Sequence, residues 1–482
     1  MRSGRGFAVL GAVGLLLAVA PGAAAAPTFT LGAPVLVTGP SLYAGCTIGA
    51  FDDNSVNYPN TELEPFVAVN PTNLSNVIGV FQEDRWNDGA AHTTGAAFST
   101  DGGATWATRY PPFAACAGGN PAYLRATDPW VSFDKAGRAY QVSQFVDLAA
   151  ISGLEASTST DGGNTWSTPF VIVEDNDITN FNDKISVTGD PTRAGYAYAT
   201  WLRTDLPGQE RNLSKLFHAF SFRGSPVISR TTDGGQTWSA PVALQGANQV
   251  AQGNQIAVLP DGTLIDVYAR LSQGSGVQPG NAAEYVAMRS SDAGRSWSRP
   301  VQIALVDTAE MTSPDDPDEF IRAGDFIPDV AVDPNTGAIY VVWASGNADG
   351  WNHVVLVKST DGGRHWTAPK QVGTTPATTH SFNGTVEVTS DGTVAVMFYD
   401  LRSNTPDLGL PTDIWLSLSS DGGKTFSEQH VTGPFDMRQA PEAGGFFLGD
   451  YQGMAATGRD LILFFATTQG DSADVYAVRA TH

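Results

Sequence analysis

The sequence predicts an all-β fold built from repeated four-stranded antiparallel units, the make-up of a β-propeller blade. Three observations predict it: one octet recurs at steady spacing, four short β-type runs fill each repeat, and the composition suits a compact β protein. Of the 482 residues, 52 are glycine, 10% are aromatic and only 16% are charged. Few charges combined with many aromatic residues and glycines argue against a disordered chain.

The recurring octet follows the pattern Ser/Thr-x-Asp-x-Gly-x-x-Trp/Phe. Its six aspartates are Asp101, Asp161, Asp233, Asp292, Asp361 and Asp421, and successive aspartates lie 59 to 72 residues apart. A fixed period of this size indicates an array of one supersecondary unit. Asp and Ser/Thr side chains can hydrogen-bond the backbone of a tight turn, Gly supplies positive φ, and the closing aromatic ring can be buried. We therefore expect a structural role for all six aspartates.

The β-type runs around each octet come in a constant order. One run, such as 353–359, precedes the octet, another, such as 238–244, follows it, and two more lead to the next octet. Turn signals separate these runs. The pair of leading runs occurs seven times, starting near residues 65, 129, 184, 254, 328, 384 and 450. Seven blades are therefore the first choice, and six blades are the alternative.

The two ends of the chain complement each other. The seventh pair of runs is followed by a third run at 474–479, after which the chain stops without another octet. Residues 31–37 match the run that follows an octet, as at 238–244. We predict that this N-terminal strand completes the last blade, which hides sheet edges that would otherwise invite aggregation. Residues 27–482 then form one domain.

Residues 1–26 have the features of an export signal. Arg2 and Arg5 precede an apolar run over 7–20, and 24–26 offers a small-residue cleavage site. That run is too short to span a bilayer, and no later segment has eighteen consecutive apolar residues. We expect a secreted, extracellular protein without a membrane span. The formal net charge of −22 argues against nucleic acid as a partner.

The two cysteines occupy equivalent places in the repeat. Cys46 follows the N-terminal strand and Cys116 follows the first octet and its strand, so both lie in a connection between a fourth and a first strand. In an exported protein this placement predicts a disulfide. Two buried thiols are the alternative.

Polar residues recur at the edge of the ring opposite the octets, where propeller ligands usually bind. The starts of the first strands carry a mostly acidic ring: Glu64, Asp128, Asp183, Asn254, Asp329, Asn383 and Asp450. The ends of the second strands carry four arginines: Arg85, Arg203, Arg270 and Arg402. Arginines above carboxylates could hold an anionic group and still offer an acid or base. We expect at least two arginines in a shared cleft; structural ion pairs are the competing interpretation.

Metal binding has weaker signals. The acidic ring could hold a hard cation such as calcium, although the chain has no compact Asp-x-Asp-x-Asp-Gly loop. The acidic run 315–319 could do the same, but a solvated loop is the simpler interpretation. The seven histidines show no zinc-site spacing. We expect no cofactor, with calcium as the one candidate.

The octets resemble the Asp box, or BNR repeat, of sialidase-superfamily β-propellers, and the resemblance covers essentially all of 27–482. It implies a sialidase-like protein directed at extracellular glycans, as an exo-acting glycoside hydrolase. In sialidases three arginines clamp the substrate carboxylate, and a Tyr paired with a Glu acts together with an Asp. An F/Y-R-I-P motif supplies one of those arginines. Here 63–66 reads Leu-Glu-Pro-Phe, with an acid in place of the arginine.

Candidate site residues follow from this resemblance and from the two polar sets. The catalytic candidates are Asp84, Asp128, Asp400 and Tyr451, with Asp84 as the preferred acid/base. The ligand-binding candidates are Arg85, Arg203, Arg270, Arg402, Glu64, Asp183 and Asp450. The alternative function is a non-catalytic propeller that binds a protein or cell-wall partner, because the same fold also serves such proteins.

Overall fold

The computed structural model describes residues 1, 27–147, 151–177, 180–205, 223–244, 249–272, 283–307, 309–324, 326–346, 348–405, 409–470 and 472–482. The described elements are β-strands apart from two three-residue 3-10 helices, η1 (Ala115–Ala117) and η2 (Met437–Gln439). The predicted all-β class is therefore confirmed. The predicted leader, 1–26, lies outside the described residues except for Met1. Within the described part of the chain, no helix has the length and apolar character of a membrane span.

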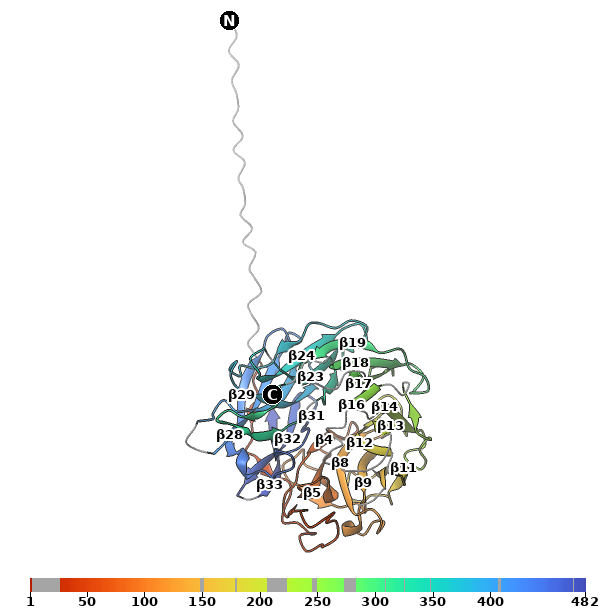
Figure 1. Cartoon of the computed structure of the whole chain (residues 1–482). Helices are drawn as coiled ribbons and strands as arrows, with labels where there is room; N and C mark the ends of the chain where they lie inside the picture. The colour runs from red at the N-terminus through yellow and green to blue at the C-terminus, as the bar shows by residue number, and fades with distance from the viewer. Residues whose placement is uncertain are drawn as a thin grey trace.

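The strands follow one another in antiparallel groups around a central axis, and the first strand of each group lies nearest that axis (Figure 1). We call each group a blade and name it by its first strand. The first two blades are the β4 blade, with β4 (Phe66–Val69), β5 (Val77–Trp86), β6 (Ala91–Ser99) and β7 (Ala107–Arg109), and the β8 blade, with β8 (Arg125–Phe133), β9 (Ala139–Val146), β10 (Ser152–Ser159) and β11 (Phe170–Asp175). Next come the β12 blade, with β12 (Asn180–Gly189), β13 (Ala197–Asp205), β14 (Arg223–Thr231) and β15 (Val242–Ala243), and the β16 blade, with β16 (Gln249–Val258), β17 (Leu264–Ser272), β18 (Ala283–Ser290) and β19 (Val301–Val306). The remaining blades are the β22 blade, with β22 (Asp329–Val332), β23 (Ile339–Gly346), β24 (Asn352–Ser359) and β25 (Lys370–Gln371); the β26 blade, with β26 (Ser381–Val388), β27 (Val394–Asp400), β28 (Pro411–Ser419) and β29 (Ser427–Asp436); and the β31 blade, with β31 (Gly453–Thr457), β32 (Asp460–Gln469) and β33 (Ser472–Thr481).

Single residue pairings join some neighbouring blades into larger sheets. Ala91 pairs with Ala126 between the β4 and β8 blades, and Gly224 pairs with Val250 between the β12 and β16 blades. A short strand, β3 (Asn57–Tyr58), adds to β5. The continuous sheets are therefore fewer than the blades.

The N-terminus completes the β31 blade. Strands β1 (Thr30–Leu31) and β2 (Val35–Leu36) both pair antiparallel with β33, with Leu31 opposite Ala480 and Val35 opposite Ala477. This is the strand pairing that the sequence predicts. Figure 1 shows the dark blue β33 beside the red-orange β5, so the first and last blades are neighbours. Phe81 of the first blade packs with Ile462 and Phe464 of the last in one apolar cluster.

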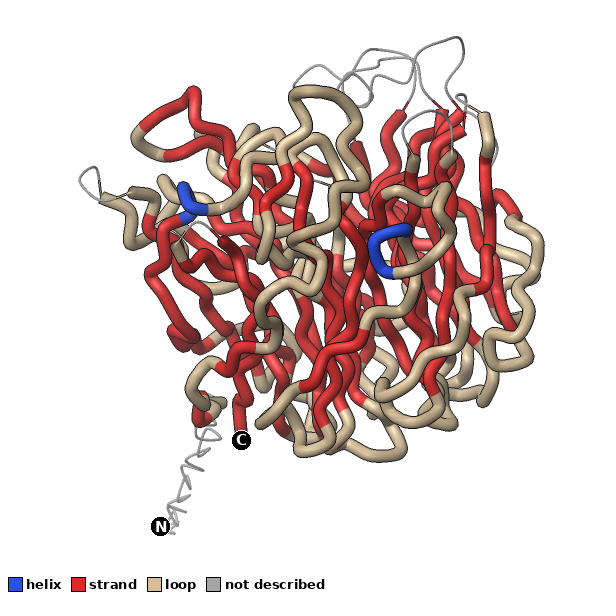
Figure 2. The backbone as a smooth tube through the Cα atoms, turned by 90° about the horizontal axis from the view of Figure 1, so that it is seen from below, coloured by secondary structure: helices blue, strands red, loops and turns tan. Residues whose placement is uncertain are grey.

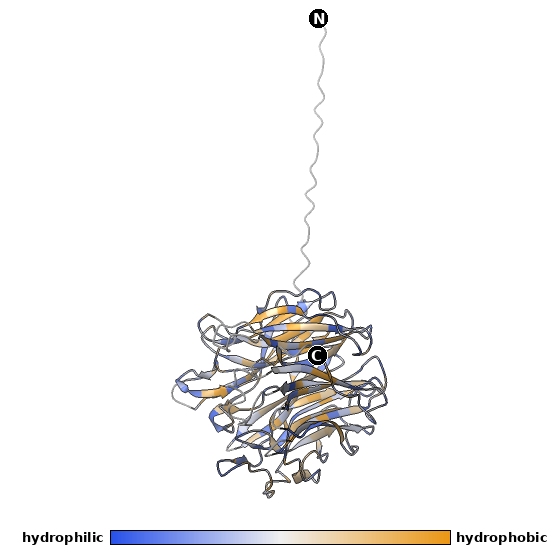
Figure 3. Ribbon diagram, turned by 45° about the vertical axis from the view of Figure 1, so that its right-hand side comes forward, coloured by the Kyte–Doolittle hydropathy of each residue, from blue (hydrophilic) through white to orange (hydrophobic). Residues whose placement is uncertain are grey.

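Many strand residues are hydrophobic, as the orange ribbon segments in Figure 3 show, and buried apolar clusters join neighbouring blades. Tyr140 and Leu154 of the β8 blade pack with Trp201 and Trp238 of the β12 blade. Burial of these large side chains is the main stabilising contribution in such a core.

The six octets form turns that share one hydrogen bond: Oδ1 of each box aspartate accepts from the backbone N–H four residues further on, at 2.9 or 3.0 Å. In the first, Asp101 Oδ1 accepts from the backbone N–H groups of Ala104 and Thr105 at 3.0 and 2.9 Å. In the last, Asp421 accepts from Lys424 and Thr425, both at 2.9 Å. Hydrogen bonds from Thr105, led by its hydroxyl, lower the pKa of Asp101 to about 2. These bonds tie each box aspartate to its own turn.

The second glycine of the octet lets the turn approach the neighbouring blade. Gly103 has a φ of +86°, and a Cβ there would lie 3.0 Å from Ile462 of the β31 blade. Figure 2 shows the strands running between two edges of the ring, with the C-terminus at the lower edge. The boxes lie at that edge too, because each follows a third strand as residue 482 follows β33.

Two connections carry additional structure. Cys46 and Cys116 form the predicted disulfide, which joins the N-terminal segment to the connection before β8. The connection before β22 contains β20 (Thr312–Ser313) and β21 (Asp316–Arg322), and β21 pairs in parallel with β30 (Phe446–Phe447). Residues 314–318 of this insertion are exposed, as expected of a solvated acidic loop.

Candidate functional site

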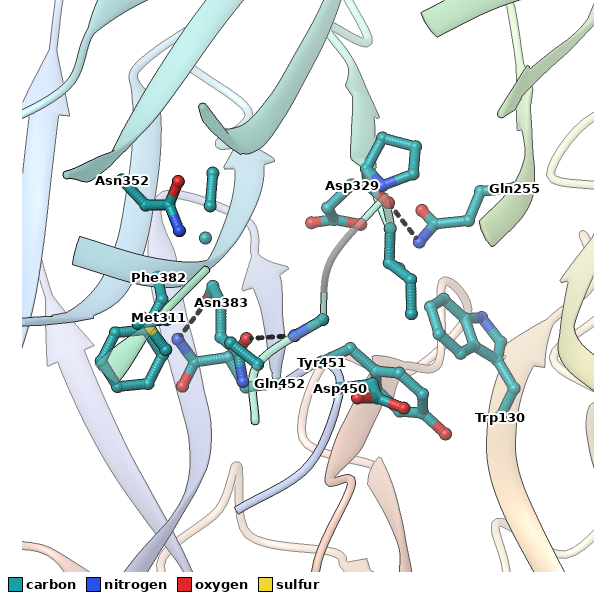
Figure 4. A pocket seen from close by; sticks show the side chains of 16 residues that line it. Trp130, Gln255, Met311, Asp329, Asn352, Phe382, Asn383, Asp450, Tyr451 and Gln452 are labelled. Carbon is teal, nitrogen blue, oxygen red and sulfur yellow. Dashed lines mark hydrogen bonds between the residues drawn. The ribbon is translucent and has the colours of Figure 1, made fainter. Parts of the chain in front are cut away.

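A narrow cavity lies near the axis of the ring (Figure 4). Its wall includes Trp130, Gln255, Met311, Asp329, Asn352, Phe382, Asn383, Asp450, Tyr451 and Gln452. These residues come from several blades and from the insertion before β22. The space around them totals about 480 Å³ including its open mouth, but the centre of a water molecule can occupy only about 20 Å³. The closed part therefore has room for about one water molecule.

Charged side chains meet beside this cavity in what we call the central cluster. Its members are Glu64, Arg85, Asp128, Asp183, Lys184, Arg322 and Asp450. Asp450 is the common partner of two cations: its Oδ2 accepts from Lys184 Nζ at 2.5 Å and from Arg322 at 2.9 Å. The backbone N–H of Lys184 donates to Asp128 at 2.9 Å. The cluster therefore connects the β8 and β12 blades, the insertion and the start of the β31 blade.

A chain of polar groups links Glu64 to the rest of the central cluster. Gln82 donates to Glu64 and, at 2.7 Å, to the hydroxyl of Thr127. Thr127 in turn donates to Asp128 at 2.9 Å. Arg85 donates to the side-chain amide oxygen of Gln82 at 3.0 Å. All of these side chains are buried.

Strained backbone before β4 and inside β8 and β12 positions three of these residues. Glu64, Asp128 and Lys184 have φ values of +51°, +50° and +53°, a region that non-glycine residues seldom occupy. The strand register shifts next to two of them, between Thr127 and Trp130 and between Asp183 and Ser186. Bulges of this kind re-aim side chains and are common at functional sites.

Two carboxyl groups of the central cluster, those of Glu64 and Asp450, differ in their protonation state. Burial raises the pKa of Glu64 to about 8, and Asp128 and Asp450 add to the rise. Burial would also raise the pKa of Asp450, but Arg322 and Lys184 outweigh it and hold that pKa well below its usual range. At neutral pH Glu64 therefore carries a proton while Asp450 is ionised.

Aromatic rings form one side of the cavity. Trp130 stacks on Phe66 with ring centroids 3.7 Å apart and meets Tyr451 edge-on at 5.0 Å. The Tyr451 hydroxyl donates to the carbonyl oxygen of Pro129 at 3.0 Å, and burial raises the pKa of Tyr451 well above its ordinary value. This geometry keeps the phenol protonated, which is the wrong state for a nucleophile.

The structure brings together most of the predicted acidic ring. Glu64, Asp128, Asp183 and Asp450 share the central cluster, and Asp329 and Asn383 line the cavity. Asn254 points elsewhere, donating to Asp266 at 3.2 Å within its own blade.

The predicted convergence of arginines needs correction. Arg85 reaches the central cluster, where its guanidinium lies 4.9 Å from the Phe447 ring. The other three pair with nearby carboxylates: Arg203 with Asp175 of the β8 blade at 2.5 Å, and, within their own blades, Arg270 with Glu284 at 2.9 Å and Arg402 with Asp400 at 2.5 Å. A nearby carboxylate neutralises each arginine locally, which costs less than gathering like charges at one point.

Two of the predicted catalytic aspartates also lie away from the central cluster. Asp400 accepts from Arg402 and, at 3.0 Å, from Trp415 Nε1. Asp84 accepts from the Ser41 hydroxyl at 2.6 Å and from the Asn60 backbone at 2.8 Å. Adjacent sequence positions such as Asp84 and Arg85 point to opposite faces of a strand, which separates them.

Sequence reasoning missed two cations of the central cluster. Lys184 directly follows Asp183 of the predicted acidic ring, and this adjacency could have indicated that Lys184 lies in the same site. Arg322 comes from the insertion before β22, which no repeat covers, so no periodicity marked it.

Comparisons with known proteins find solved structures that this chain resembles in fold. No protein-family model and no curated protein matches the chain. Among solved structures, the chain is similar to the Hadza microbial sialidase Hz136, with 16% identity over 82% of this chain and 75% of that one and a TM-score of 0.47. The GH93 alpha-L-arabinofuranosidase of Fusarium graminearum has 14% identity, coverage of 81% and 98%, and a TM-score of 0.47. Trypanosoma rangeli sialidase has 12% identity, coverage of 89% and 60%, and a TM-score of 0.44.

The blades and the six Asp-box turns of the chain itself give it a sialidase-like β-propeller fold.

Proposed function

We propose that this chain is a secreted, seven-bladed propeller directed at extracellular glycans, and that its central cluster is the active site of an exo-acting glycoside hydrolase. The observation that supports this proposal is that, beside the cavity, Glu64 is protonated at neutral pH while Asp450 is ionised. Two carboxyl groups with pKa values driven apart are the usual arrangement for cleaving a glycosidic bond.

Each carboxyl group has a distinct proposed role. Glu64, protonated at neutral pH, donates a proton to the leaving oxygen of the glycosidic bond. Asp450, kept ionised by Lys184 and Arg322, lines the cavity and stabilises the positive charge that develops on the sugar. Lys184 and Arg322 act as positioning residues, because they fix the charge and orientation of Asp450.

The cavity wall suits one terminal sugar. Trp130 and Tyr451 offer apolar ring surface, and Gln255, Asp329 and Asn383 offer polar groups for hydroxyls. Because the closed part has room for about one water molecule, a sugar ring enters only if side chains at the mouth move. A narrow cavity of this kind would admit the end of a glycan chain rather than its middle, which is why the proposal is for exo-action.

The experiment is a screen of the purified protein against fluorogenic glycosides, with sialosides and arabinofuranosides included, followed by a Glu64→Gln variant. We expect kcat of the variant to fall by about 100-fold or more while glycan binding persists. Wild-type activity should decline as pH rises through about 8, because Glu64 then loses the proton it donates. Glu155→Gln is the matched control, since burial raises the pKa of Glu155 to about 8 in a different blade.

Two outcomes would contradict the proposal. Full activity of Glu64→Gln would remove Glu64 from the mechanism. Glycan or protein binding without hydrolysis of any glycoside would support the non-catalytic alternative.

A further inference from the structure

A second group of buried acids lies where the first blade meets the N-terminal segment and the last blade. Glu62, Glu83 and Asp84 each place one carboxylate oxygen within 4.8 Å of the other two. All three side chains are fully buried, with exposed fractions of 0%. We call them the junction acids. Three carboxyl groups at this separation cannot all be ionised in a buried site without a balancing charge.

The junction acids contain oxygens without hydrogen-bond partners. Both oxygens of Glu62 and Oε1 of Glu83 are buried and accept no hydrogen bond of normal geometry; the Thr38 side chain lies near Glu62 and only partly offsets the rise in its pKa. The other oxygens are used: Tyr110 donates to Glu83 Oε2 at 2.8 Å, and Ser41 donates to Asp84 at 2.6 Å. Burying unpaired carboxylate oxygens is costly, so their grouping points to a ligand that the oxygens share.

Protein cations do not balance the junction acids. Among the described residues, no Lys or Arg forms an ion pair with any of the three, and the basic group in contact is His92, 3.1 Å from Asp84. Burial raises the pKa of Glu83 to about 8 and that of Glu62 well above its usual range. Proton uptake is therefore the competing way to neutralise the group.

We infer that Glu62, Glu83 and Asp84 bind a Ca²⁺ ion. Ca²⁺ takes carboxylate oxygens at 2.3 to 2.6 Å, so two oxygens on one ion lie at most about 5 Å apart, as the junction acids do. Hard oxygen ligands exclude the softer metals that prefer Cys and His. Cys46 and Cys116 near His92 are joined in a disulfide and offer no thiolate.

The site would tie together three parts of the ring. Glu62 donates its backbone N–H to Ala473 of β33 at 2.8 Å, and Thr61 pairs with the same residue. Ser41 brings the N-terminal segment to Asp84. An open surface depression lies next to the group: Asn60, one of its lining residues, donates its backbone N–H to Asp84 at 2.8 Å. The ion would therefore fasten the N-terminal segment and last blade to the first blade.

The experiment compares thermal unfolding of the full-length secreted protein in EDTA and in millimolar CaCl₂. We expect Ca²⁺ to raise Tm by about 3 °C or more in the wild type. A Glu62→Gln/Glu83→Gln variant should lose this shift yet be at least as stable as the wild type in EDTA, because glutamine is buried without having to take up a proton on folding. Glu155→Gln, a buried glutamate with one unpartnered oxygen, should keep the shift.

A direct measurement guards against misfolding of the double variant. Tb³⁺ replaces Ca²⁺ at oxygen sites, and its luminescence can be excited through the nearby Tyr110. Wild-type protein should show luminescence that Ca²⁺ displaces, and the single Glu62→Gln variant should lose most of it. Absence of both a Tm shift and Ca²⁺-sensitive luminescence in the wild type would overturn the inference. So would an unchanged Ca²⁺ shift in the folded double variant.

Discussion

At the scale of single residues, charge balance explains the central cluster. Asp450 is buried and ionised only because Lys184 and Arg322 contact it. The side chain of Lys184 is only 7% exposed, and that of Asp450 only 5%. Removing one partner of such a pair leaves an uncompensated buried charge, whereas the loss of an exposed pair is small.

Lys184→Met should therefore lower the free energy of unfolding by about 3 to 5 kcal/mol, as measured by urea denaturation. The loss should persist from about pH 4 to 10. The pKa of Asp450 is lowered in the folded chain, so Asp450 contributes to the free energy of unfolding at every pH above its unfolded pKa near 4. The pKa of Lys184 is raised, so Lys184 contributes at every pH below its unfolded pKa of about 10. Arg203→Met, at a pair with a 37% exposed arginine, should cost less than about 1 kcal/mol. Equal costs for both variants would contradict this account.

Single residues were only partly predictable. Glu64, Asp128, Asp183 and Asp450 could be found because their position repeats in every blade. The pairing of Arg203 with Asp175 could not, since Asp175 lies on another strand whose register no local pattern specifies. Arg322 was hidden for a different reason: it lies in an insertion without repeats.

At the scale of elements, the Asp-box turn does more than reverse the chain. Its aromatic residue reaches the preceding blade: Trp238 is 8% exposed and meets Tyr140 edge-on with centroids 6.5 Å apart. The turn and its aromatic residue were predictable, because the octet carries both. The hairpin β20–β21 and its parallel partner β30 were not, because each occurs once.

Trp238→Ala should lower the free energy of unfolding by about 3 to 5 kcal/mol through lost burial and the cavity left behind. Glycan binding and hydrolysis should be unaffected in the folded variant, since the box lies at the other edge of the ring. Val242→Ala is the control, because Val242 is 56% exposed and should change stability by less than about 0.5 kcal/mol. An unchanged Tm for Trp238→Ala would show that the boxes do not support the blades.

At the scale of the whole molecule, two groups of carboxyl side chains have opposite effects on how the stability of the fold changes with pH. Burial raises the pKa values of Glu64, Glu83 and Glu155 to about 8, so each holds its proton in the folded chain but loses it near 4.5 when unfolded. Their effect makes stability fall as pH rises from about 4.5 to 8. Turn hydrogen bonds lower the pKa of Asp101 to about 2, so its contribution is lost as pH falls below about 4.

Thermal unfolding in EDTA should therefore show the highest Tm near pH 4 to 5, with a decline on either side. The decline above pH 5 should be smaller in the Glu83→Gln and Glu155→Gln variants, because each removes one of the groups that causes it. A Tm that keeps rising from pH 5 to 8 in the wild type would contradict the assigned pKa directions.

The pairing of β1 with β33 also sets the order in which the chain can fold. Thr30 lies opposite Thr481, so the first strand made is completed by the last one made, 451 residues later. Closing a loop of that length costs about 5 kcal/mol of chain entropy. The strand pairing and packing that offset this cost form only when all the blades are in place. During synthesis the earlier blades can form in sequence while the outer strand of the last one waits. Ring closure should then be the late, slow event of folding and the first to reverse on unfolding.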